Sequence, residues 1–152
     1  MDTRLAEVIR RKLDYLERTL SEIAPYLQSD YIHYARQPTV RRATERLVQI
    51  IVEVIGDTSE LILQAAEKPA PGSLREALSG IHDLGVFDDQ LWERFNRAHV
   101  GLRNRIVHDY ETLDSRILFD SAKRLHTDAQ AFLKSVARYL ASTDHRKSND
   151  EP

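Results

Sequence analysis

The chain has 152 residues, of which 41% are hydrophobic and 30% charged, and its formal net charge is −2 at pH 7. This length fits one domain with its own core, and the composition is that of a folded protein rather than a disordered or membrane-embedded one. The absence of cysteine excludes disulfides, thiolate metal sites and cysteine nucleophiles, and it is compatible with a reducing cytoplasm. Because the net charge is slightly negative, any contact with nucleic acid must come from a local group of basic residues.

No segment is expected to enter a membrane. The longest apolar run, at 50–52, is broken by Glu53, and it is far shorter than the ~20 residues of a membrane span. Residues 1–4 lead straight into a charged segment and lack the apolar stretch of a signal peptide. We therefore expect a cytoplasmic protein.

Helical periodicity accounts for the chain in five segments, without a convincing strand. The first segment covers 3–24, and Pro25 is expected to end it. A short aromatic turn of helix at 26–36 precedes the second long segment, at 39–66.

Two further helices follow the clearest break in the chain, the KPAPG segment at 68–72. Ser73 is expected to cap a helix at 74–84, and Asp88 a helix at 89–109.

The last helix begins after a cap at Asp114 or Ser115 and is expected to run to about Leu140. The polar residues 142–152 are expected to fray. The prediction is a single domain at 1–141, an all-α, up-and-down bundle of about five helices, followed by a tail at 142–152.

The predicted helix at 89–109 carries three rows of side chains. At about 100° per residue, its narrow apolar row must face the core: Leu91, Phe95, Ala98, Leu102 and Ile106. A second row, on roughly the opposite side, has no explanation in this chain's own core: Arg97, Gly101, Asn104 and His108. A third row lies beside the apolar one: Trp92, His99, Arg103 and Tyr110.

Arg103 and His108 together have the chemistry to cut a phosphodiester. Histidine can move a proton near neutral pH, and arginine can hold a phosphate with a fixed fork of donors. However, positions five apart point about 140° away from each other on a straight helix. Either the helix distorts near His108, or a second subunit completes the site. We favour a dimer, because a two-fold axis through this face would bring two copies of each side chain into one cleft.

Structural explanations stay open for each of these signals. The spacing of Arg103 and His108 also arises by chance, and Arg94, Arg97 and Arg105 could form a solvated face. Most of the remaining histidines are expected at the surface or at helix caps: His33, His82, His99, His126 and His145. No metal site is predicted, since His99 and His108 do not share a helix face.

The ordered set GLRNRIVHDY at 101–110, followed by Leu113 and Asp114, resembles the HEPN superfamily, and within it the HepT-like toxins with their Arg-x4-His-x-Tyr motif. The upstream segments 46–56 and 74–86 are also similar to that family, so the resemblance spans about 3–140. Two positions depart from the family pattern: Leu102 stands where an aromatic residue is frequent, and Asp109 where a small residue is frequent. Neither is a motif position.

The resemblance implies a metal-independent endoribonuclease that acts as the toxin of a toxin–antitoxin pair. The helix geometry leads us to expect a homodimer, and no cofactor is predicted. His108 would move the proton, Arg103 would stabilise the charged phosphorane, and Asn104 would orient His108 or the phosphate. Arg97 and Arg105 would bind RNA.

The implied partner is a minimal nucleotidyltransferase antitoxin, which in some family members transfers AMP from ATP onto the motif tyrosine, here Tyr110. Two other functions stay open. One is a non-catalytic HEPN module that binds nucleotide or assists a nucleotidyltransferase, and the other is a purely structural helical dimer.

Overall fold

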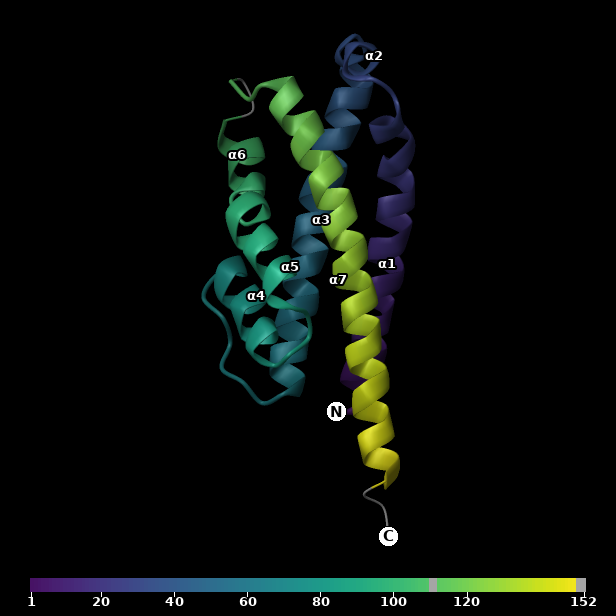
Figure 1. Cartoon of the computed structure of the whole chain (residues 1–152), viewed down its shortest axis with the longest axis vertical. Coiled ribbons are helices and arrows are strands. Elements are labelled where there is room, and N and C mark those ends of the chain that lie inside the picture. Colours follow the sequence, from purple (N-terminus) through teal and green to yellow (C-terminus); the bar gives the residue numbers. More distant parts are fainter. Residues whose placement is uncertain (110–111, 150–152) are drawn as a thin grey trace.

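The computed structural model describes residues 1–109 and 112–149, and within these ranges every regular element is a helix (Figure 1). Three long helices run side by side: α1 (Thr3–Gln28), α3 (Pro38–Ala65) and α7 (Ser115–Asn149). The short α2 (Tyr31–Ala35) connects α1 to α3 at one end of the bundle. The predicted all-α bundle is confirmed.

The remaining helices lie along the other side of α3 (Figure 1). They are α4 (Leu74–Asp83), α5 (Asp89–Arg94), a π-helical turn η1 (Phe95–His99) and α6 (Leu102–His108). α6 packs against α3 and lies at the end of the bundle where α7 begins. α6, which carries Arg103 and His108, is therefore supported by α3 and lies beside the start of α7.

Local capping explains where the shorter helices start. The Ser73 hydroxyl accepts a hydrogen bond from the backbone N–H of Glu76 at 3.1 Å, and Asp88 accepts one from the N–H of Leu91 at 2.8 Å. Each bond satisfies a donor that the first turn of a helix leaves free. Of the two candidate caps for α7, Asp114 has this role, since its carboxylate accepts from the N–H of Arg116 at 2.7 Å.

Two predicted helix ends are wrong. α1 continues through Pro25 to Gln28, because Leu27 is buried in the core and only one more turn of helix is needed to place it there. α7 continues past Leu140 to Asn149, so the expected domain boundary at 141 falls inside this helix. An ion pair of 2.7 Å between Arg10 and Asp144 joins this extension to α1.

The core lies between the three long helices and the inner faces of α4 to α6. Its fully buried side chains come from every layer, and they include Ile9, Leu16, Ile51, Ile55, Leu78, Phe95, Leu102 and Phe132. Burying a side chain of this size contributes about 1.5–3 kcal/mol. In the part of the chain that the structure describes, no helix is long and apolar enough to cross a membrane.

Candidate active site

The helix expected at 89–109 is not continuous, because η1 interrupts it. The N–H of Val100 donates to the carbonyl of Phe95 at 3.0 Å, a bond between positions five apart instead of four. Such a π-bulge accommodates one extra residue within a single turn of the helix.

The bulge changes which side chain enters the core. Leu91, Phe95, Leu102 and Ile106 are buried as predicted. Ala98, predicted to be buried with them, is only partly buried, and His99 takes its place with 2% of its surface exposed. His99 is thus an exception to the expectation that most of these histidines lie at the surface or at caps.

His99 is held by a carboxylate from α7. Its Nε2 lies 2.7 Å from Oδ2 of Asp128, while Oδ1 of Asp128 accepts a hydrogen bond from Nε of Arg94 at 2.8 Å. Burial lowers the pKa of His99, although its hydrogen bond to Asp128 acts in the opposite direction. His99 is therefore neutral at pH 7, with its proton on Nε2, because a carboxylate can only accept. Its buried Nδ1 has no hydrogen-bond partner in the described part of the chain.

Arg103 lies on α6 and is paired with α3. Its Nε donates to Oε1 of Glu53 at 3.1 Å, and both side chains are about half exposed. Glu53 was not among the predicted site residues. Its carboxylate fixes one edge of the guanidinium and leaves the terminal nitrogens available to a phosphate.

His108 and Asn104 are exposed on α6, as is Gly101 just before it. A Cβ added at Gly101 would meet no atom within 4 Å, so no packing inside this chain requires a glycine there. α6 is a regular α-helix up to His108, so Arg103 and His108 point about 140° apart. Of the two predicted alternatives, the helix does distort, but at η1 and not between these two residues.

Tyr110, the predicted modification site, lies outside the described residues.

Arg97 and Arg105, the predicted RNA-binding residues, line one cavity of about 370 Å³. This cavity lies between η1, α6 and α7, and its other lining residues are Arg94, Ala98, Ile117, Ser121, Arg124 and Asp128. Arg124 was not among the predicted site residues. A carboxylate in the buried row of α7, between Leu125 and Phe132, was the available signal that this helix contributes to a polar site.

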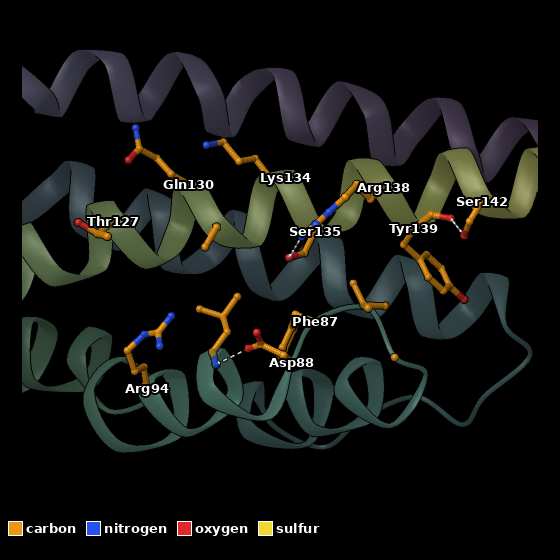
Figure 2. Close-up of a pocket in the computed structure, with 14 residues that line it drawn as sticks. Phe87, Asp88, Arg94, Thr127, Gln130, Lys134, Ser135, Arg138, Tyr139 and Ser142 are labelled. Atoms are coloured by element: carbon orange, nitrogen blue, oxygen red, sulfur yellow. Dashed lines mark hydrogen bonds between the residues drawn. The ribbon is translucent and has the colours of Figure 1, made fainter.

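A larger cavity, of about 850 Å³, lies further along α7 and contains no motif residue (Figure 2). Phe87 and Asp88 line one side of it, and Lys134, Arg138 and Tyr139 project from α7 on the other. Arg94 lines both this cavity and the smaller one. In the described ranges, no three histidine, aspartate or glutamate side chains converge in a way that could hold a metal ion.

Comparison with known proteins identifies the family. A family model described as "Ribonuclease HepT-like" matches residues 16–136, which is most of the chain. The chain belongs to the HepT-like family. A curated relative, named "tRNA nuclease HepT" and from Aphanizomenon flos-aquae (strain 2012/KM1/D3), is 26% identical over 144 residues, which cover 95% of this chain and 92% of the relative.

Solved structures share the fold of this HepT-like chain. A cytosolic protein of unknown function, YutE from Bacillus subtilis, superposes with a TM-score of 0.77 at 22% identity, covering 90% of this chain and 91% of YutE. A tri-AMPylated HEPN toxin from Shewanella oneidensis, solved in complex with an MNT antitoxin, gives a TM-score of 0.77 at 20% identity, covering 91% of this chain and 99% of the toxin.

Arg103 and His108, the two residues of the predicted motif that the structure describes, both belong to α6. The structure adds three residues that motif spacing did not indicate. Glu53 contacts Arg103, while Asp128 and His99 hold η1, the turn that sets the direction of α6.

Proposed function

We propose that this HepT-like protein is a metal-independent endoribonuclease and the toxin of a toxin–antitoxin pair. The family match and the relative named tRNA nuclease support the nuclease assignment. The observation that carries it is the position of His108 and Arg103 on an exposed helix. His108 is exposed, and Arg103 is fixed by one edge only. Neither side chain is buried in the core, so both are available for catalysis.

RNA supplies its own nucleophile, the 2′-OH. Its oxygen attacks the neighbouring phosphorus, and the bond from phosphorus to the 5′-oxygen breaks as the new bond forms. One His108 accepts the proton of the 2′-OH, and a protonated His108 donates one to the departing 5′-oxygen. Arg103 stabilises the negative charge on the phosphorane, and Asn104 orients His108 or the phosphate. The products are a 2′,3′-cyclic phosphate and a 5′-OH end.

The active form is proposed to be a dimer, assembled through the surface of Gly101, Asn104 and His108. Two observations support this surface. The space beside Gly101 is open, so another chain can approach closely, and Val107 leaves 41% of its surface exposed on the same helix. A two-fold axis there would bring Arg103 of one protomer towards His108 of the other, overcoming their angular separation on a single helix.

The proposed partner is a minimal nucleotidyltransferase antitoxin that silences the toxin by adding AMP to Tyr110. The Shewanella oneidensis toxin of similar fold is tri-AMPylated and bound to an MNT antitoxin. Each added AMP carries a phosphodiester charge, which would repel the RNA backbone from a site two residues away. We place both activities in the cytoplasm, where RNA and ATP are available.

The deciding experiment is to incubate the purified chain with tRNA and with mixed RNA, in excess EDTA, and to analyse the product ends. Cyclic phosphate and 5′-OH ends, lost in a folded His108→Ala variant, are expected. Cleavage that stops on chelation, or products with 3′-OH ends, would contradict the mechanism. A folded dimer that does not cleave RNA would instead favour the non-catalytic HEPN module.

A further inference from the structure

Four arginines from four different elements meet around the 370 Å³ cavity. They are Arg94 of α5, Arg97 of η1, Arg105 of α6 and Arg124 of α7. Among the lining residues that the structure describes, Asp128 is the only acidic one. The chain as a whole has a net charge of −2, so this cavity concentrates positive charge against the overall balance.

The carboxylate of Asp128 already accepts hydrogen bonds from two side chains. Asp128 is buried, and its two oxygens accept from Nε of Arg94 and from His99. Arg94 therefore keeps a fixed orientation while its two terminal nitrogens stay available. Asp128 therefore holds the guanidinium of Arg94 in place at the cavity while remaining buried itself.

The positive charges of the other three arginines are less fully neutralised by nearby carboxylates. Nη2 of Arg124 donates to the hydroxyl of Ser121 at 3.3 Å, and within the described ranges no carboxylate forms an ion pair with Arg124 or Arg105. Arg97 faces Glu93 one turn away at 3.7 Å, with both side chains largely exposed. A surface ion pair of this kind has a small interaction free energy, so Glu93 does not hold Arg97 firmly and the cavity keeps an excess of positive charge.

We propose that this cavity binds phosphates of the RNA strand that flank the phosphate being cleaved, with Arg124 as a binding residue on α7. The inference rests on the proposed ribonuclease function and extends it to α5 and α7. On α6, Arg105 lies about 60° around the helix axis from His108, so a strand that contacts His108 passes beside the cavity. Guanidinium groups match phosphate oxygens in pairs, and the exposed Ile117 adds an apolar wall that a ribose or base can cover.

The test is to measure binding of a labelled 2′-O-methyl oligoribonucleotide at several salt concentrations. This probe lacks the nucleophile, so binding is read without cleavage. The variant is Arg124→Gln. The matched control is Arg138→Gln, since Arg138 is also exposed on α7 and its Nη2 also donates to a serine three residues earlier, at 3.4 Å.

Arg124→Gln should weaken binding about fivefold at 0.1 M salt and reduce the slope of log affinity against log salt by about 0.7, the value for one phosphate contact on a single strand. Arg138→Gln should match the wild type. Equal affinity and slope in Arg124→Gln and the wild type would overturn the proposal. The proposal would also be overturned if Arg124→Gln bound RNA normally but no longer bound ATP or the antitoxin. The cavity would then bind a free nucleotide or a protein.

The two proposals fail differently. If the chain binds the probe through Arg124 but never cleaves RNA, the cavity assignment stands and the nuclease is wrong. If it cleaves RNA and Arg124→Gln changes neither binding nor the salt slope, the nuclease stands and the cavity assignment is wrong.

Discussion

Arg103 and Glu53 join α6 to α3 through a hydrogen-bonded ion pair of 3.1 Å. The arginine proposed to stabilise the transition state is therefore oriented by a residue 50 positions earlier in the chain. Because the pair is about half exposed, its contribution to folding is at most ~1 kcal/mol. The main effect of this contact is to orient the guanidinium of Arg103.

Glu53→Gln is expected to lower kcat about tenfold with little change in KM, because Arg103 would act mainly in the transition state. Thermal stability should change little. Glu60→Gln, an exposed position further along α3, is the control. Equal kcat in the wild type and Glu53→Gln would mean that Glu53 does not position Arg103, and a rise in KM alone would assign the pair to substrate binding.

His108→Ala should reduce RNA cleavage by ~10²–10⁴-fold, the usual cost of losing a general acid–base group. Its melting temperature should match that of the wild type, because the side chain is exposed. His33→Ala removes another exposed histidine, on α2, and should cleave normally. Retained activity in His108→Ala would refute the assigned role.

Gly101→Gln is expected to give a folded monomer with greatly reduced cleavage. A Cβ at Gly101 meets nothing within 4 Å and the residue is exposed, so the added side chain can extend away from its own chain and obstruct a second protomer. Light scattering reads the oligomeric state, and far-UV circular dichroism reads the helix content. Gly101→Ala, a much smaller change, should stay dimeric. A wild-type protein that is monomeric at micromolar concentration would rule out the composite site.

The stability of the protein should fall as the pH drops below about 6.5, partly because of His99. Burial lowers its pKa from the ordinary value of 6.5, so the unfolded chain takes up a proton before the folded one does. Stability from this group is then present above the unfolded pKa and is lost with a slope of up to ~1.4 kcal/mol per pH unit as the pH falls. Urea unfolding at several pH values measures it.

His99→Gln keeps a donor for Asp128 but cannot titrate, so its stability should depend less on pH as the pH falls below about 6.5. His33→Asn is the control for the removal of an exposed histidine. An unchanged slope in His99→Gln would show that His99 is not the titrating group.

Tyr110→Phe should escape AMP transfer by the antitoxin while retaining most of its cleavage activity, because the phenol moves no proton in the proposed reaction. An added phosphodiester ~4 Å from a bound phosphate would be repelled by about 4 kcal/mol at an effective dielectric of ~20, before screening by salt. Intact-mass measurement after incubation with antitoxin and ATP reads the modification. AMP found on another residue would reject the mechanism of control but not the nuclease.

The features that depend on neighbouring residues were predictable from the sequence. Ser73 and Asp88 cap helices because a hydroxyl or carboxylate just before an apolar periodic segment has a local donor to accept from. The buried row from Leu91 to Ile106 also follows from spacing, except at one position.

The features that depend on distant residues were not predictable. The exchange of Ala98 for His99 requires a partner on α7, and Asp128 is 29 positions away. Arg124 and Glu53 enter the site only because α7 and α3 pack beside α6 and η1. The periodicity of one helix gives no information about these contacts. It describes how residues are arranged around that helix axis and not the angle at which two helices pack.

The π-helical turn η1 takes up one more residue than an α-helical turn while completing about the same rotation. A chain lacking one residue between 95 and 99 would therefore close this turn as regular α-helix, and α6 would keep its exposed and buried faces. The deletion would change the approach of His99 to Asp128 and would leave Asn104 and His108 facing outward. The extra residue thus serves the buried contact with α7 and not the exposed face of α6.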